Sequence, residues 1–337
     1  MTHPRSPHRP PHPGHVSSRR EFLHRGLQAG AAIALTGGLG AWLWNRHPPG
    51  DFNRRAPTTL LPDFSLKDSG RQMSLVTGTD RPAMLRRGLD AMGGLERFIK
   101  QGDRVMLKVN AAFATPAILS ATSNPELVAE LIRLCLAAGA SSVLVTDNPI
   151  NDPESCFNLT GLAPAVRAAG AELIVPRASQ FMPGTLPGGR LIRDWPVLHG
   201  PFRGVTKLIG VAPVKHHNRA GASMTMKNWY GLLGGRRNQF HQDINGIIVE
   251  LAMMVRPTFV VLDGTTSMMT NGPTGGSLAD LKATNTLIVS TDPVAADAFG
   301  ATLLGQSWRD LPYLGRAVEL GIGTADFESL RPERDAV

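Results

Sequence analysis

The sequence predicts an α/β fold: a largely parallel sheet with helices on both faces, built as one domain or as two α/β lobes. Three observations predict it. From residue 73 onward, short apolar stretches alternate with stretches of helical spacing. The short stretches are apolar at nearly every position, as in strands covered on both faces. Several helical stretches begin at a capping residue followed by proline, or end at glycine.

The alternation can be followed along the chain. In the first half, strands are expected over 74–77, 103–110, 142–146 and 171–175, and helices over 84–92, 124–138 and 162–169. In the second half, strands are expected over 205–211, 258–262 and 287–290, and helices over 242–254 and 293–304. Asn124-Pro125 is a typical helix start, and Gly139 is a typical helix end. Residues 151–158 are rich in turn formers and are expected to form a loop.

The excess of positive charge is concentrated near the N-terminus. Residues 1–55 carry eight arginines and two acidic residues, a net charge of +6. Only +2 of the total charge of +8 therefore belongs to the remaining 282 residues. With no basic stripe interleaved with aromatic residues in the body, the sequence argues against a nucleic-acid partner.

The N-terminal segment resembles an export signal. Ser18-Arg19-Arg20-Glu21-Phe22-Leu23 precedes an uncharged stretch, 26–44, that contains five glycines. Paired arginines before a weakly hydrophobic segment are typical of a twin-arginine signal, which predicts the twin-arginine translocase as a partner and a periplasmic or other extracytoplasmic location. An ordinary membrane helix with positive flanks is the alternative.

The fate of that segment stays open from the sequence. No Ala-x-Ala cleavage site follows the apolar stretch, so residues 1–47 could remain as an anchor in the inner membrane. Residues 48–72 are expected to be a linker, and residues 73–330 the α/β domain, with 73–200 and 201–330 as its lobes if there are two.

Two cysteines limit the cofactors that the chain could hold. Cys135 lies in an apolar stretch and is expected to be buried, and Cys156 lies in the turn-rich stretch. Two thiols cannot bind a four-cysteine iron–sulfur cluster. Spacing alone does not show whether they form a disulfide.

One polar segment stands out as a candidate site. Of the four histidines in the body, three lie between residues 215 and 241, together with two lysines and a Trp-Tyr pair. Polar residues also follow several of the predicted strands: Lys108, Asn110, Asp147, Asp263 and Asp292. Ligands of α/β sheets bind beyond the carboxyl ends of the strands, so we expect a site there.

Three interpretations of this segment compete. A divalent metal could be held by His216 or His217, His241 and a carboxylate such as Asp263. A phosphate or carboxylate could instead be held by lysines and by backbone amides of the glycine-rich loops 234–235 and 272–276. The third interpretation is structural, with these side chains satisfying loop backbone groups and capping helices.

Long, ordered motifs connect the chain to a known family. They are Lys108-Val109-Asn110, Lys215-His216-His217-Asn218, the run 225–231, Asp263-Gly264, Asn271-Gly272-Pro273 and the run 290–297. With these motifs, residues 73–324 resemble the domain-of-unknown-function family numbered 362. The resemblance implies an α/β domain that is often exported by the twin-arginine route. Some members carry ferredoxin-like cysteine modules, which this chain lacks.

The leading hypothesis is an exported enzyme that acts on a small anionic substrate, with or without a divalent metal. The catalytic candidates are His216, His217 and Lys227, with either histidine as general base. The residues expected to bind the ligand are Lys108, Asn110, Lys215, Asn228, Gly272 and Asp292. A non-catalytic, membrane-tethered binding protein and a redox accessory protein are the alternatives.

Overall fold

A computed structural model describes residues 20, 23–24, 27–28, 30, 60–66 and 70–337. The chain divides after residue 51, and the second unit is residues 52–337. Most of the predicted signal or anchor and most of the predicted linker lie outside the described residues. In the described part of the chain, no helix is both long enough and apolar enough to cross a membrane.

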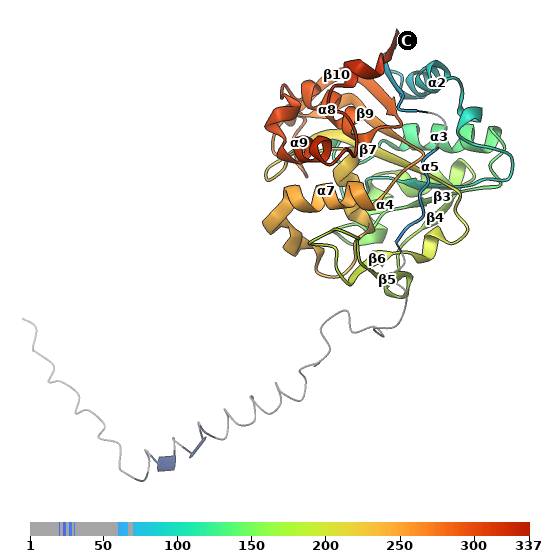
Figure 1. The fold of residues 1–337 in the computed structure, drawn as a ribbon. Helices are drawn as coiled ribbons and strands as arrows, with labels where there is room; N and C mark the ends of the chain where they lie inside the picture. The colour runs from blue at the N-terminus through green and yellow to red at the C-terminus, as the bar shows by residue number, and fades with distance from the viewer. Residues whose placement is uncertain (1–19, 21–22, 25–26, 29, 31–59, 67–69) are drawn as a thin grey trace, which may run out of the picture. The chain divides into compact units, whose positions relative to one another are not determined.

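The core of the second unit is one sheet of nine strands, mostly parallel (Figure 1). Eight strands follow the order β11-β1-β10-β9-β7-β2-β3-β4, and β8 pairs with β7. The strands of this sheet are β1 (Met73–Thr77), β2 (Arg104–Lys108), β3 (Ser142–Thr146), β4 (Glu172–Ile174), β7 (Lys207–His217), β8 (Gly221–Ser223), β9 (Phe259–Met268), β10 (Leu281–Ser290) and β11 (Glu333–Ala336). A separate hairpin joins β5 (Phe181–Gly184) and β6 (Trp195–Leu198).

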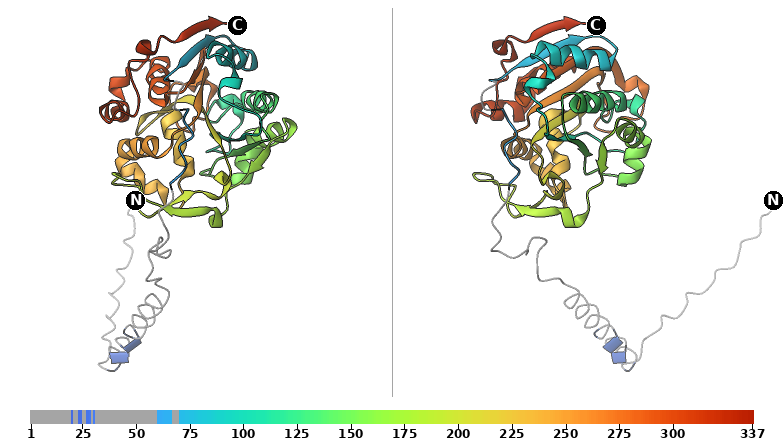
Figure 2. Two further views of the ribbon diagram at one scale, coloured as in Figure 1. Left: turned by 45° about the vertical axis from the view of Figure 1, so that its right-hand side comes forward. Right: turned by 90° about the vertical axis from the view of Figure 1, so that its right-hand side faces the viewer.

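Helices cover both faces of the sheet (Figure 2). The described helices are α2 (Arg81–Ala91), α3 (Pro125–Ala137), α4 (Pro153–Leu159), α5 (Leu162–Ala168), α6 (Thr225–Asn228), α7 (Ile244–Met254), α8 (Pro293–Leu303) and α9 (Pro312–Glu319). Buried side chains of α2, α3, α4 and α5 form one core, and those of α6, α7, α8 and α9 form the other. The predicted fold class is therefore confirmed.

The side-chain alternation of the strands divides the two cores. On β2, Val105 and Leu107 belong to the core under α2 and α3, whereas Met106 belongs to the core under α6 and α7. On β9, Phe259 and Val261 lie in the first core. This alternation also decides which face each polar strand-end residue occupies, because it continues to the end of a strand.

The sheet is continuous across the two halves of the chain. β2 pairs in parallel with β3 on one side and with β7 on the other, so strands of 73–200 and of 201–330 share one ladder. The sheet does not divide at residue 200.

The ends of several elements differ from the sequence-based expectations. β7, β9 and β10 extend well beyond the apolar stretches, and β7 includes the polar run Lys215–His217, which pairs with β8. The prediction of a loop over 151–158 is wrong, because α4 lies there, with Asp152 as its N-cap and Pro153 in its first turn. That Asp-Pro pair is the same start signal as Asn124-Pro125, which was correctly interpreted for α3.

The two cysteines are free thiols and do not form a disulfide. Cys135 on α3 and Cys156 on α4 are both buried and unpaired. Burial raises the pKa of Cys135 to about 12 and that of Cys156 to about 11. Both remain neutral thiols near neutral pH, so they are not poised as nucleophiles.

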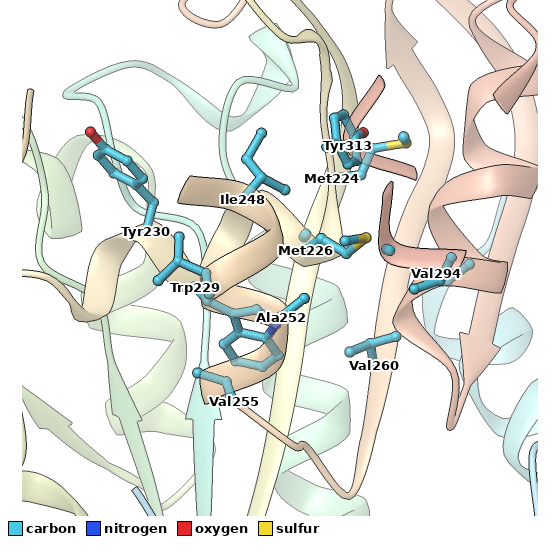
Figure 3. Packing of buried hydrophobic residues seen from close by; sticks show 14 of the residues in the cluster. Met224, Met226, Trp229, Tyr230, Ile248, Ala252, Val255, Val260, Val294 and Tyr313 are labelled. Carbon is cyan, nitrogen blue, oxygen red and sulfur yellow. The ribbon is translucent and has the colours of Figure 1, made fainter. Parts of the chain in front are cut away.

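The polar run 225–232 is anchored by apolar side chains. Trp229 packs toward Ala252 and Val255, while Tyr230 points away from this cluster (Figure 3). The Trp229 ring lies where a side chain on Gly210 would be, since a Cβ there would come within 2.7 Å of the indole. This packing holds α6 and the following 3₁₀ turn, η5 (Trp229–Leu232), against β7.

The buried carboxyl of Asp297, on α8, supports the start of α6. It accepts hydrogen bonds from the backbone nitrogens of Thr225 at 2.8 Å and of Met226 at 3.1 Å. Burial nevertheless raises the pKa of Asp297 to about 7, although these donors favour the charged form.

The raised pKa predicts a pH-dependent loss of stability. The folded protein binds a proton at Asp297 that the unfolded chain releases above about pH 4, so stability falls from about pH 4 to about pH 7. The variant Asp297→Asn lacks this titration. The unfolding free energy of the wild type should therefore fall relative to that of Asp297→Asn across this range, as measured by urea denaturation. A difference that does not change with pH would contradict the assignment.

Candidate functional site

The candidate site is a cavity of about 70 Å³ beyond the carboxyl ends of β2 and β3, beside the second half of β7. Its walls come from both halves of the chain. The lining residues are Lys108, Asn110, Ala112, Phe113, Asp147, Asn148, Ile150, Lys215, His217, Ser223, Lys227, Asn228, Tyr230, Gly231, Arg237, His241 and Pro273. We call this cavity the lysine pocket, because three of the seven lysines of the chain line it.

A buried ion pair forms the floor of the lysine pocket. Lys108, at the end of β2, places its Nζ 2.7 Å from Oδ1 of Asp147, which follows β3. The other carboxylate oxygen of Asp147 accepts a hydrogen bond of 2.7 Å from the backbone nitrogen of Ala111. Gly231 closes over the pair, since a Cβ at that position would lie 1.9 Å from Asp147 Oδ1 and 2.8 Å from Lys108 Nζ. Only glycine permits this approach.

Hydrogen bonds extend from the ion pair across the pocket. Nζ of Lys108 donates to Oδ1 of Asn228, which also accepts from Nδ2 of Asn110, both at 3.2 Å. Oδ1 of Asn110 then accepts from Nζ of Lys215 at 3.3 Å. The side-chain nitrogen of Asn228 donates to the backbone carbonyls of Lys108 and Val211. Asn228 and Asn110 thus position the lysines rather than offering free groups to a ligand.

Lys215 and Lys227 differ from Lys108 in their partners. Nζ of Lys215 donates to two neutral oxygens, those of the Asn110 side chain and the Ala121 carbonyl. Among the described residues, the Lys227 ammonium has neither a hydrogen-bond acceptor nor a carboxylate, and it lies 5.2 Å from the centroid of the Tyr230 ring. Burial, reinforced by nearby cations, lowers the pKa of Lys215 to about 7 and that of Lys227 to about 8.

Arg237 fixes the wall of the pocket through backbone carbonyls. Its guanidinium donates to the carbonyls of Tyr230 and Leu233 and to those of Asn148 and Pro149. These bonds join the loop after β3 to the turn after α6. Because four of its five N–H directions are accounted for by these contacts, Arg237 contributes positive potential rather than a free donor fork.

The two histidines of the pocket have opposite hydrogen-bonding roles. Nδ1 of His217 accepts from the backbone nitrogens of Arg219 and Ala220, so the neutral ring carries its proton on Nε2. Nδ1 of His241 lies 3.1 Å from the Asn238 carbonyl, which places the proton on Nδ1 and a lone pair on Nε2. The rings are nearly parallel, with centroids 6.0 Å apart.

These roles change the expected general base. Burial and the charge of Lys227 lower the pKa of His217 to about 2, so this ring stays neutral and acts as a donor. Burial, followed by the charge of Lys227, lowers the pKa of His241 as well. His241 is therefore the histidine with a basic nitrogen available, and His217 is not suited to be the base that the sequence suggested.

Four predicted site residues do not line the lysine pocket: His216, Asp263, Gly272 and Asp292. His216 alternates with His217 along β7, and its Nδ1 accepts from the backbone of Gly272, which serves the loop rather than a ligand. Asp263 falls on the α2 face of β9, where it binds Arg81 at 2.8 Å. His216, His241 and Asp263 are thus not brought together, and among the described residues no group of three or more metal-ligating side chains is assembled.

Asp292 is separated from the pocket by strand direction. β10 runs antiparallel to β9, so Ser290 lies opposite Val260, near the start of β9. Asp292 follows β10, which therefore ends at the edge of the sheet opposite the carboxyl ends of β7 and β9. It caps α8 through the nitrogens of Val294 and Ala295 and pairs with Arg71 at 3.3 Å.

Three members of the pocket were missed as site residues. Asp147 was noted only as a polar residue after a strand, and Tyr230 only as part of an aromatic pair. Arg237 carried no signal, because its position depends on loops that meet only in the folded chain. Lys108 was the available clue to Asp147. It ends β2, the neighbour of β3 in the sheet, and a lysine at the end of a buried strand needs a carboxylate nearby.

Comparison with known proteins places the chain in a family. The family described as Domain of unknown function (DUF362) matches residues 105–302, more than half of the chain, and the chain belongs to it. The match contains every residue that lines the lysine pocket. A protein of Synechocystis sp. named as thylakoid-associated is 23% identical over 258 residues, covering 74% of this chain and 78% of that protein. Neither description names a reaction.

The close approach at Gly231 predicts a specific loss of stability. In Gly231→Ala, the methyl group would displace the Asp147 carboxylate from Lys108, and we expect unfolding to become easier by about 1–3 kcal/mol. Gly315→Ala is the matched control, because the nearest atom to a Cβ there lies 4.0 Å away and the position is helical. Equal stability of the two variants in urea would contradict the packing described.

Proposed function

We propose that this protein is an enzyme that binds a small carboxylate or phosphate in the lysine pocket. One observation carries the proposal: four cationic side chains line the pocket, and Asp147 is the single carboxylate among its lining residues. Buried charges are normally paired, so this excess of positive charge supports an anionic ligand as the missing partner.

Lys227 is the residue that supports this proposal most directly. A partly buried ammonium without a protein acceptor has lost hydration and gained only the Tyr230 ring in return. A carboxylate or phosphate at this position would supply a charge-assisted hydrogen bond. The Nε2–H of His217 provides a second donor on the same wall.

The same pocket contains groups suited to proton transfer. Lys215 has a pKa of about 7, so near neutral pH it can act as a proton donor or as a proton acceptor. His241 offers a lone pair on Nε2. An anion bound between Lys227 and His217 would therefore have an acid and a base within one cavity, which favours catalysis over passive binding.

The proposed location is outside the cytoplasmic membrane. It is supported by the twin-arginine pattern of residues 18–23, and the name of the Synechocystis protein, which is thylakoid-associated, supports association with a membrane. The twin-arginine translocase would be the partner during export. The name of that relative also favours the second candidate, a membrane-tethered binding protein that uses the same pocket without catalysis.

Removal of the Lys227 charge should abolish most anion binding. Lys227→Met keeps the apolar stem on the Tyr230 ring, so its melting temperature should stay near that of the wild type, while affinity for oxalate should fall at least about tenfold. Isothermal titration calorimetry measures this loss. Lys282→Met, at an exposed lysine on β10, is the control for an equal change in net charge. A large loss of stability with unchanged affinity for oxalate would contradict the prediction and show that Lys227 has a structural role.

Anion affinity should decrease as the pH rises. Anions bind the protonated lysines, and in the free protein Lys215 and Lys227 lose their protons near pH 7 and pH 8. Affinity should thus be full below about pH 6 and decrease toward about pH 9, with proton uptake on binding. Calorimetry in two buffers of different ionisation enthalpy measures that uptake. Affinity that increases with pH would contradict anion binding by these lysines.

A further inference from the structure

We propose that Lys215 is a nucleophile that forms an imine with a small 2-oxo acid held in the lysine pocket. This inference rests on the proposed anion binding and adds a substrate class and a covalent step. Its basis is the contrast between the three lysines of one cavity, whose amino groups have different partners.

The first part of the argument is the set of partners of each amine. Lys108 has a carboxylate at 2.7 Å, which favours its ammonium form and opposes the lowering of its pKa by burial. Lys215 contacts only neutral acceptors, the Asn110 side chain and the Ala121 carbonyl. An amine in its neutral form can keep such contacts through its own N–H groups while its lone pair becomes available.

The second part is the environment of the Lys215 nitrogen. The side chain is almost completely buried, and Nζ lies 5.2 Å from the centroid of the Phe113 ring. The charges of Lys227 and Lys108 disfavour a further positive charge at this position. Desolvation beside other cations is one of the ways in which lysines become nucleophiles at neutral pH.

The third part is the shape of the ligand that the pocket would accept. Lys227 is free to bind a carboxylate, and Lys215 lines the same cavity of about 70 Å³. The remaining wall includes the apolar residues Ala112, Phe113, Ile150 and Pro273. A short molecule with a carboxylate next to a carbonyl carbon fits this combination, whereas an inorganic phosphate has no electrophilic carbon for Lys215.

The chemistry balances without an added oxidant or reductant. The lone pair of Lys215 Nζ forms a bond to the carbonyl carbon as the carbon–oxygen π bond breaks, giving a carbinolamine. The oxygen then leaves as water with both hydrogens of the amine, and a carbon–nitrogen double bond remains. Lys227 and His241 line the same cavity; in the proposed step Lys227, as an ammonium, would donate a proton to the departing oxygen and His241 Nε2 would accept one from nitrogen.

Reductive trapping tests the imine directly. The full chain is incubated with pyruvate and sodium borohydride, digested, and its peptides are mapped by mass spectrometry. We expect one pyruvate-derived group on Lys215, whose formation is suppressed by oxalate, which has no ketone carbon. The exposed Lys100 and Lys282 measure non-specific modification within the same sample. Lys215→Arg, which keeps the charge, should bind oxalate and give no adduct in the pocket.

The outcomes separate this inference from the proposed function. Oxalate binding without an adduct on Lys215 overturns the imine and leaves anion binding intact. An adduct on Lys227 instead of Lys215 overturns the assignment of the nucleophile. If oxalate does not bind and no adduct forms, both proposals fail. Because the adduct is mapped in the wild-type protein, the result does not depend on whether Lys215→Arg folds.

Discussion

The buried ion pair between Lys108 and Asp147 is the interaction on which the rest of the site depends. It joins the ends of two neighbouring strands, and Gly231 brings the turn after α6 into contact with it. A buried charge that loses its partner is strongly destabilising, so neither residue can be exchanged alone without disturbing both strands and the turn. Asn228 and Asn110 then carry the order from this pair to Lys215.

The proposed function rests on the charges that this network leaves unbalanced. One carboxylate neutralises one lysine, and the lining residues include no second carboxylate for the other cationic side chains. Such an arrangement lowers the stability of the folded chain in the absence of a ligand, which is a common property of sites that bind charged molecules. The same imbalance distinguishes Lys215 from the ordinary surface lysines of the chain, because its neighbours favour the neutral amine.

The fold could be predicted further than the site. Apolar strands and capped helices identified the α/β class and most elements, because these signals are local; the α4 helix was missed although Asp152-Pro153 carried the same signal. Seven of the candidate site residues line one cavity, as their places at strand ends and in one segment suggested: Lys108, Asn110, Lys215, His217, Lys227, Asn228 and His241. Asp263 and Asp292 were not, because strand alternation and the antiparallel direction of β10 are set by pairing between distant segments.

The carbonyl contacts of Arg237 have a consequence for the rate at which a ligand binds. Four backbone oxygens from two loops hold the guanidinium, so this wall is formed before any ligand arrives. Association with the proposed anion would then require little rearrangement and would be an encounter between a diffusing anion and a fixed positive field. The rate constant of such an encounter decreases as ionic strength rises, because counterions screen the field over about 10 Å at 0.1 M salt and over shorter distances at higher salt. The salt concentration of the compartment therefore becomes part of the control of this site.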